Sequence, residues 1–232
     1  MKTWKGYNIW DLILILLGNI TILIASVIFK SNWLVIIQSI FCLLTVFTQA
    51  KGKIITQFLG IITFIFYIII SYQEKLYGEA ILYLVILLPM YIYGAINWLK
   101  NKDKQNSDLV EVKSNLSKKE WSCMFVGFVI VSICSYFLLK SLNTELLIIS
   151  TLSFISMLPA LYLLIRRCKW NQVAFLLNDL FVICLWIVLV INGNLSYVPL
   201  VVCFIFQMIY DIYGIFEWIK LEKKQQNKNT AN

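Results

Sequence analysis

Long apolar segments alternate with short polar ones along the whole chain. The apolar segments are residues 12–29, 33–49, 54–72, 80–98, 121–139, 146–165, 173–191 and 197–218. Each is long enough, or nearly so, to cross a hydrocarbon core of about 30 Å as a helix. The pattern predicts an all-α membrane protein with eight transmembrane helices, or seven if the first segment only lies at the membrane surface.

Composition supports this fold class. Hydrophobic residues make up 60% of the chain, charged residues only 14%, and the mean hydropathy is +0.80. Such a sequence is too apolar for a water-soluble domain of 232 residues. The chain is therefore expected to contact membrane lipids along most of its length.

The chain has a net charge of +8. The positions of its basic residues are explained by the orientation of the chain in the membrane. Seventeen of the 20 Lys and Arg residues fall in the terminal segments and in alternate loops on one side, against Lys30, Lys75 and Lys140 on the other. The positive-inside rule then predicts that both termini are cytoplasmic. Nucleic-acid binding is excluded, because the charges lie between apolar segments and form no polar face.

An internal repeat divides the chain. An offset of 120 places the second half on the first, and it pairs Tyr77 with Tyr197, Tyr93 with Tyr213, Gly94 with Gly214, Trp98 with Trp218, and Lys100 with Lys220. Residues 1–99 and 121–220 are predicted to be two parallel membrane repeats of four spans each. Residues 100–120 read as a cytoplasmic linker, and residues 221–232 as a disordered cytoplasmic tail.

The sequence lacks the motifs of several classes of chemistry. The chain has no His, its six Cys lack Cys-x-x-Cys spacing, and no ATP-binding Gly-rich loop or Ser nucleophile motif is present. We expect packing thiols, no metal, no cofactor and no enzyme activity.

Polar residues inside the apolar segments are the candidates for a binding site. An ionised carboxylate near a span centre costs about 2.5–3.5 kcal/mol, which singles out Asp179 and Asp211. Asp11 and Glu217 lie at segment ends, where they can reach water, and weigh less. Asn178 and Trp186 accompany Asp179, while Gln207 and Trp218 share a helix face with Asp211, so that amides and carboxylates stand beside aromatic rings. This chemistry suits a flat polar solute with hydroxyl groups, neutral or cationic, such as a vitamin or nucleoside.

The first repeat adds Gln57, Asn97 and Trp98 to the predicted site. Gln38 and Tyr67 could line the same cavity, and interhelical hydrogen bonding competes with ligand binding for each such residue. An aromatic belt at the cytoplasmic boundary is the alternative role for Trp98 and Trp218. Kinks are expected at Pro89 and Pro159.

Four motifs carry a resemblance to a known family. They are Tyr77-Gly78-Glu79-Ala80, Tyr93-Gly94-Ala95-Ile96-Asn97-Trp98-Leu99-Lys100, Arg167-Cys168-Lys169-Trp170 ahead of Asn178-Asp179, and Asp211-Ile212-Tyr213-Gly214-Ile215-Phe216-Glu217-Trp218. In this order, and over roughly residues 51–220, the chain resembles the PnuC family of bacterial vitamin transporters, relatives of the SWEET sugar carriers.

The resemblance implies two three-helix bundles, spans two to four and six to eight, joined through the fifth span, with the substrate between them. It implies alternating-access uptake of nicotinamide riboside, a precursor of NAD, by facilitated diffusion across the bacterial plasma membrane. A cytoplasmic kinase on another chain would trap the product without a required contact, and a homo-oligomer is an open alternative.

Other readings remain open from the sequence. The same fold could carry thiamine, riboflavin or a deoxynucleoside, or act as a substrate-binding subunit that needs an ATPase partner. An enzyme that uses Asp179 and Asp211 as a carboxylate pair is disfavoured, because no nucleophile or metal set accompanies them.

Overall fold

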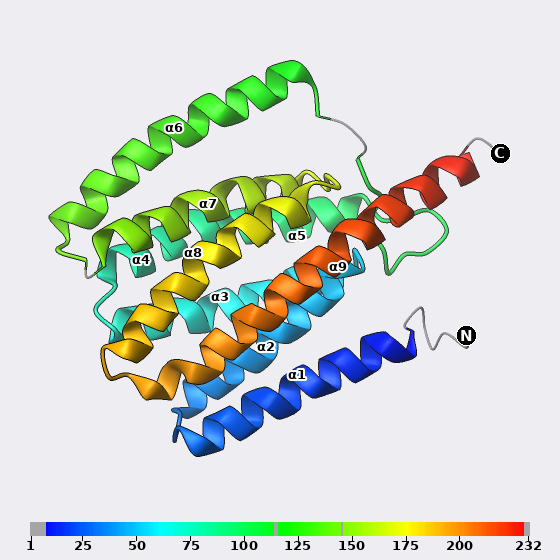
Figure 1. Ribbon diagram of the computed structural model, residues 1–232. Coiled ribbons are helices and arrows are strands. Elements are labelled where there is room, and N and C mark those ends of the chain that lie inside the picture. The colour runs from blue at the N-terminus through cyan, green and yellow to red at the C-terminus, as the bar shows by residue number, and fades with distance from the viewer. Residues whose placement is uncertain (1–7, 114–115, 145, 230–232) are drawn as a thin grey trace.

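The computed structural model describes residues 8–113, 116–144 and 146–229, and within them the fold is helical with three isolated β-bridges. The elements are α1 (Ile9–Ile28), α2 (Trp33–Ala50), α3 (Ile55–Gln73), α4 (Tyr77–Leu82), the π-helix η1 (Tyr83–Leu87), α5 (Leu88–Lys100), α6 (Lys118–Ser141), α7 (Leu147–Ile165), α8 (Asn171–Ile191), the 3₁₀ turn η2 (Leu195–Tyr197) and α9 (Val198–Asn229) (Figure 1). They form eight helical segments long and apolar enough to span a membrane, and the first is α1. The prediction of an all-α protein with eight spans is confirmed.

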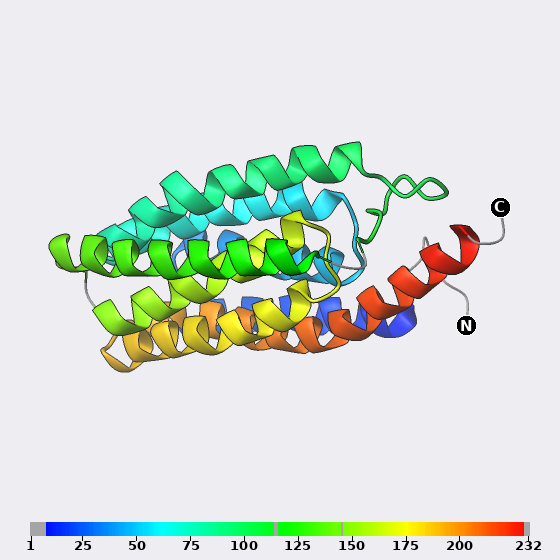
Figure 2. The same ribbon diagram turned by 90° about the horizontal axis from the view of Figure 1, so that it is seen from above.

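Six of the spans form a closed ring. Going round it, α2 packs on α3, α3 on the span made by α4, η1 and α5, that span on α7, α7 on α8, α8 on α9, and α9 on α2. The two remaining helices lie outside the ring, α1 against α2 and α9, and α6 against α7 and α4 (Figures 1 and 2). Spans two to four and six to eight are therefore contiguous halves of the ring, as the two-bundle prediction requires.

The repeat is visible in the turns that follow corresponding helices. Left-handed backbone conformations occur at Lys30 and Asn143 after α1 and α6, at Gly52 and Arg167 after α2 and α7, and at Lys75 and Gly193 after α3 and α8. A left-handed residue reverses the chain direction at a helix end. The same three reversals in each half give the halves the same path through the ring.

Close packing between helices repeats as well. A Cβ atom built on Gly94 would lie 2.9 Å from Gln57 Oε1, and one built on Gly214 would lie 2.8 Å from Gln172 Cδ. Each glycine therefore lets α5 or α9 approach the start of the preceding span. This explains why a Tyr-Gly pair stands at both places in the sequence.

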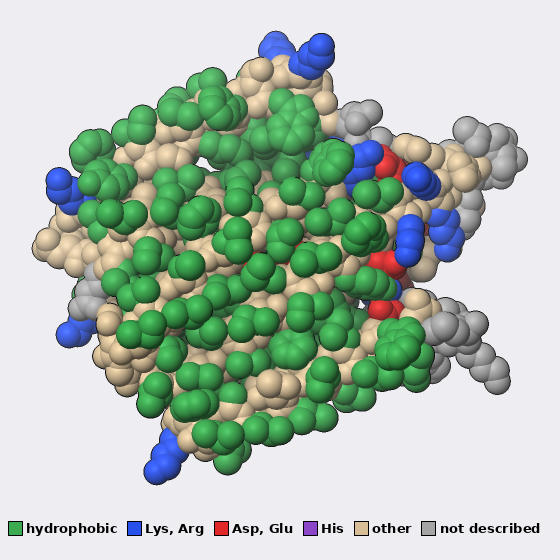
Figure 3. All heavy atoms as spheres, in the orientation of Figure 1, with side chains coloured by type: hydrophobic (Ala, Val, Ile, Leu, Met, Phe, Trp, Pro, Cys, Tyr) green, Lys and Arg blue, Asp and Glu red, His purple; other side chains and the backbone are tan. Residues whose placement is uncertain are grey.

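The molecular surface matches a membrane environment. Hydrophobic side chains cover most of the face in Figure 3, while charged side chains gather at the two ends. Both termini lie at the same end, which also carries the Asp and Glu side chains visible on this face (Figures 1 and 3). The rest of the protein buries little of helix α6, so the apolar side chains of this helix are placed for contact with lipid.

Pro89 and Pro159 have different surroundings. Pro89 stands near the start of α5, directly after the π-helix η1, whereas α7 continues as one helix through Pro159. Because proline removes one backbone donor, the widened turn before Pro89 is where the fourth span departs from α-helical geometry. π-turns of this kind are frequent at functional sites.

The prediction of a disordered tail is wrong for residues 221–229, which continue α9. The polar side chains find partners in the linker: the Val112 N–H donates to Gln225 Oε1 at 2.8 Å, and Gln225 Nε2 donates to Val110 O at 3.0 Å. Lys169 and Glu222 form an ion pair at 2.8 Å. Hydropathy alone predicts that these residues are exposed to solvent, because it contains no information on contacts with residues distant in sequence. Residues 230–232 lie outside the described part.

Candidate functional site

A small cavity of about 50 Å³ lies in the middle of the ring. It is smaller than typical small-molecule sites, about 300–1,000 Å³, so a ligand of that class requires the ring to widen. All six ring spans contribute to its wall, which combines aromatic rings with amides, hydroxyls and a thiol. The lining residues are Gln38, Cys42, Thr45, Val46, Gln49, Gly60, Thr63, Phe64, Tyr67, Tyr83, Tyr91, Met157, Phe175, Asn178, Val182, Phe204 and Gln207. None of these carries a formal charge.

Two of the predicted site residues lie on the cavity wall. Asn178 donates from Nδ2 to Ser153 O at 2.8 Å and to Ser156 Oγ at 3.0 Å, so its amide orientation is fixed by α7. Gln207 donates from Nε2 to Asp179 Oδ1 at 2.6 Å and accepts from the Cys42 thiol at 3.3 Å. Both amides are held in place before any ligand binds, which favours specific recognition.

The predicted carboxylates lie behind the cavity wall. Asp179 and Asp211 are almost completely buried next to each other, and Asp179 bonds to Gln207, which lines the cavity. With its amide nitrogen toward the carboxylate, Gln172 donates to Asp211 Oδ1 at 2.8 Å and accepts from Trp218 Nε1 at 3.3 Å. A polar chain therefore runs from the cavity to the end of the ring near the termini.

Trp98 and Trp218 close that end of the ring. Both are fully buried, and their ring centroids are 6.0 Å apart. Trp98 Nε1 donates to Leu164 O and Trp218 Nε1 to Gln49 O, each at 2.9 Å. Each indole thus bonds to the other half of the chain. The aromatic-belt alternative is excluded, since neither ring is at the protein surface.

The remaining predicted residues do not line this cavity. Trp186 is fully buried in an aromatic cluster, with its ring 5.8 Å from Tyr67 and 5.2 Å from Tyr197. Gln57 lies beneath Gly94, and Asn97 Nδ2 donates to Ile165 O at 2.6 Å. The structure gives Asn97 a role in joining α5 to α7, and a direct role of these three in binding stays a prediction.

Sequence reasoning missed most of the aromatic wall. Phe64, Tyr67, Tyr83 and Tyr91 stand together, with Tyr67 stacked on Tyr83 at 4.7 Å and Phe64 edge-on to Tyr91 at 4.8 Å. Rings in an apolar span can face lipid, another helix or a cavity, and hydropathy treats these alike. The polar residues Gln38 and Tyr67 gave a signal, because each interrupts an apolar segment.

At the end away from the termini, the two halves are joined by Glu74. Its carboxylate accepts from Asn194 Nδ2 at 2.8 Å and from the Tyr197 hydroxyl at 2.5 Å. Nearby, the Gly78 N–H donates to Thr144 Oγ1 at 3.2 Å. Polar contacts between the halves therefore exist at both ends of the cavity.

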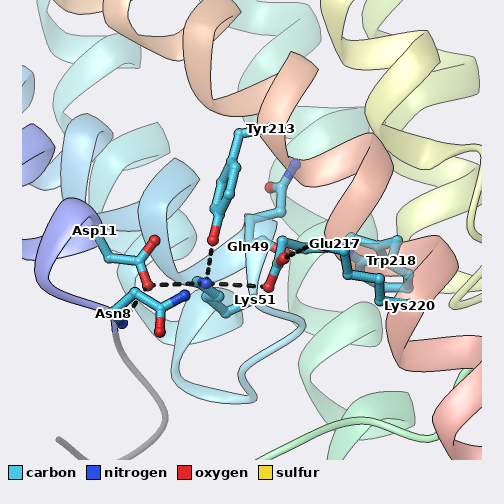
Figure 4. Close-up of polar contacts among 8 residues, drawn as sticks. All are labelled: Asn8, Asp11, Gln49, Lys51, Tyr213, Glu217, Trp218 and Lys220. Atoms are coloured by element: carbon cyan, nitrogen blue, oxygen red, sulfur yellow. Dashed lines mark hydrogen bonds and ion pairs between the residues drawn. The ribbon is translucent and has the colours of Figure 1, made fainter. Parts of the chain in front are cut away.

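Near the termini, Lys51 gathers charged and polar groups from both halves. Figure 4 shows its ammonium group between Asp11, Tyr213 and Glu217. Lys51 Nζ lies 2.9 Å from Asp11 Oδ2 and 3.0 Å from Glu217 Oε2, and it also bonds to the Tyr213 hydroxyl. The pKa of Lys51 is raised: burial by itself would lower it, but the contacts with Tyr213, Asp11 and Glu217 outweigh burial. The ion pairs join α1 and the α2–α3 turn to α9.

A substitution at Gly60 tests how tightly the aromatic wall of the cavity is packed. A Cβ atom at this position would overlap the Tyr91 ring, whereas one at Gly127 in α6 would meet nothing within 4 Å. Gly60→Ala is therefore expected to displace Tyr91 and to weaken ligand binding about tenfold, at the scale of about 1–3 kcal/mol for overpacking. Ligand affinity measured by calorimetry on purified protein checks this. Gly127→Ala is the matched control with no expected loss, and equal behaviour of the two variants would contradict the packing account.

Comparison with known proteins adds the family. A family model described as "Nicotinamide mononucleotide transporter" matches residues 32–220. The nicotinamide riboside transporter PnuC of Neisseria mucosa is 25% identical over 210 residues, covering 88% of this chain and 80% of that protein. The protein of the same name from Haemophilus influenzae is 24% identical over 224 residues, covering 95% and 93%.

A solved structure shares the fold. The crystal structure of the vitamin B3 transporter PnuC superposes with a TM-score of 0.82 at 23% identity, covering 96% of this chain and 95% of that one. The family match omits α1, which is also peripheral to the ring. With more than half of its residues matched, the chain belongs to the nicotinamide mononucleotide transporter family of multi-pass membrane proteins.

Proposed function

We propose that this protein takes up nicotinamide riboside by facilitated diffusion. The observation that carries the proposal is an uncharged cavity, walled by amides and aromatic rings, at the centre of a fold shared with the vitamin B3 transporter PnuC. Aromatic faces suit the nicotinamide ring, while amides and hydroxyls suit the ribose and the carboxamide. The curated relatives are named for the same substrate.

The cavity chemistry favours the riboside over the mononucleotide. A phosphate group is normally bound by Arg, Lys or backbone N–H groups at a helix start. The described cavity wall has no basic side chain, and its 17 lining residues lie along spans. A phosphate dianion would therefore enter without a counter-charge, which is costly in a buried site.

Transport requires the cavity to open to one side at a time. We propose that the halves of the ring rock against each other, so that contacts at one end break while those at the other hold. Trp98, Trp218 and the Lys51 ion pairs are the contacts at the end near the termini, and Glu74 is the contact at the far end. Residues 1–99 and 121–220 are the moving repeats in this proposal, with residues 100–120 as the linker.

Orientation follows from charge. We propose a location in the bacterial plasma membrane with both termini in the cytoplasm, since 17 of the 20 basic residues belong to that side. The Trp98–Trp218 contact would then close the cytoplasmic exit. A cytoplasmic kinase on another chain would trap the imported riboside by adding a phosphate. We also propose that the protein can form a homo-oligomer.

Two alternatives are separable from this proposal. The fold could carry thiamine, riboflavin or a deoxynucleoside, or the chain could need an ATPase partner. The test is uptake of radiolabelled nicotinamide riboside into liposomes that hold only the purified protein. We expect downhill uptake that excess unlabelled riboside blocks, and that thiamine, riboflavin, deoxyadenosine and nicotinamide mononucleotide leave unaffected. Block by another competitor would change the substrate, and absence of flux would favour a missing partner.

A further inference from the structure

Glu79 is a buried carboxylate that does not itself line the cavity. It lies in the first turn of α4 and is 0% exposed. The Tyr67 hydroxyl donates to its Oε1 at 3.1 Å and Ser153 Oγ to the same atom at 3.3 Å. Its Oε2 has no hydrogen-bond partner, and no ion pair reaches Glu79 among the described residues. An ionised carboxylate so placed needs a positive charge that the described residues do not supply.

The residues around Glu79 form the aromatic part of the cavity wall. Tyr67 bonds to Glu79 and lines the cavity, and Tyr83 lies one helical turn after Glu79 and lines it too. Trp186 is edge-on to Tyr67 at 5.8 Å, and Phe64 is edge-on to Tyr83 at 5.5 Å. Clusters of aromatic rings backed by a carboxylate are typical of sites for permanently charged organic cations.

We propose that Glu79 is the counter-charge that makes the cavity select a cationic ring. The proposal rests on the proposed function and adds its charge specificity: the pyridinium end of the substrate would lie among Tyr67, Tyr83 and Phe64, with Glu79 behind them. Glu79 acts through space and through Tyr67, so it is a positioning residue for the ring. A cation in this place stabilises the ionised carboxylate, which in turn stabilises the bound cation.

The low polarity of the surroundings makes this pairing effective. Tyr67, Tyr83 and Trp186 are buried, and the cavity wall near them is mostly rings. The Glu79 carboxylate and a cation on the other side of the aromatic wall would attract each other more strongly in these surroundings than in water. Asp179 and Asp211 are the other buried carboxylates at the cavity, but Gln207 and Gln172 cover them. Glu79 instead accepts a hydrogen bond directly from an aromatic residue of the cavity wall, Tyr67.

The test compares two forms of the same riboside. Oxidised nicotinamide riboside carries one positive charge, and its dihydro form, which has one more hydride, carries none. We expect the wild type to bind the cation more tightly than the neutral form. Glu79→Gln keeps the size and hydrogen-bonding capacity of the side chain and should raise Kd and KM for the cation about tenfold or more. The values for the dihydro form should change less than about threefold.

Glu79→Asp keeps the charge and is the rescue variant, expected to retain most of the preference for the cation. A purely structural role of Glu79 would weaken both ligands equally in Glu79→Gln, and that result would overturn the proposal. A charge preference that survives in Glu79→Gln would assign it to Asp179 and Asp211 instead. Equal binding of both forms by the wild type also overturns it, even if the variant fails to fold. Wild-type protein that binds neither form refutes the proposed substrate itself, which separates the two failures.

Discussion

Replacing Trp98 and Trp218 together by phenylalanine is expected to open the cavity toward the end of the molecule that carries both termini. The variant keeps an aromatic ring at each position but removes both indole N–H donors to Leu164 O and Gln49 O. Each such bond contributes about 0.5–1.5 kcal/mol. Because both bonds cross between the halves of the chain, their loss favours the open state by about tenfold or more in population.

Cys42 is a native reporter of this opening. Its side chain lines the cavity, is 4% exposed and bonds to Gln207. In a background that lacks the other five cysteines, we expect a membrane-impermeant thiol reagent to modify Cys42 about ten times faster in the double variant. The gain should appear only in vesicles that present the termini to the reagent.

A pair of exposed tryptophans provides the control. Trp10 and Trp121 are 69% and 39% exposed, so phenylalanine at both positions should leave the modification rate of Cys42 unchanged. Faster modification from the far side, or equal rates in all variants, would contradict a gate made by Trp98 and Trp218.

Lys51→Met is expected to lower the free energy of unfolding by about 3–5 kcal/mol. Removing one partner from a buried ion pair leaves the other charge uncompensated, and that cost is of this size. The side chains of Lys51 and Asp11 are only 8% and 4% exposed, and that of Glu217 is 22% exposed. Denaturant unfolding of the protein in detergent micelles, followed by tryptophan fluorescence, measures the change.

Lys220→Met is the matched control, because Lys220 also pairs with Glu217 but is 73% exposed. Exposed pairs contribute about 0–1 kcal/mol, so this variant should unfold nearly as the wild type does. Adding Asp11→Asn to Lys51→Met should restore part of the loss. Equal destabilisation by Lys51→Met and Lys220→Met would mean that the buried pairs contribute little.

The pH dependence of the Lys51 contribution follows from its raised pKa. A group whose folded pKa exceeds its unfolded value stabilises the fold fully below the unfolded pKa, here 10.5, and loses this effect as the pH rises through the folded value. The deficit of Lys51→Met should therefore be the same throughout the neutral range. A deficit that shrinks between about pH 6 and pH 9 would contradict a raised pKa.

Much of the fold could be predicted from the sequence, because the membrane imposes simple rules. A span must be apolar and about 20 residues long, and a duplicated chain repeats its landmarks. The start of α2 at Trp33 and the end of α7 at Ile165 coincide with the apolar segments. The prediction of a disordered tail failed because it depended on local sequence alone. The partners of Gln225 are the backbone groups of Val110 and Val112, which no local pattern reveals.

The candidate site was harder to predict than the fold. Asn178 and Gln207 face the cavity, but Gln57 and Asn97 are used for packing and for a bond between helices. A polar residue in a span can face a ligand or another helix, and its sequence position does not distinguish these two roles. Glu79 was predicted only as part of a family motif and not as a site residue, because a carboxylate in the first turn of a helix is favourable for local reasons.

The matched turns of the two halves have an evolutionary consequence. A pair of identical half-length chains could form the same six-membered ring, but each mutation would then appear at both equivalent places. In one fused gene, position 97 holds an Asn that bonds to the backbone of Ile165, while position 217 holds a Glu that binds Lys51. A single chain can therefore hold different residues at equivalent positions of its two halves, as the binding of an asymmetric molecule requires.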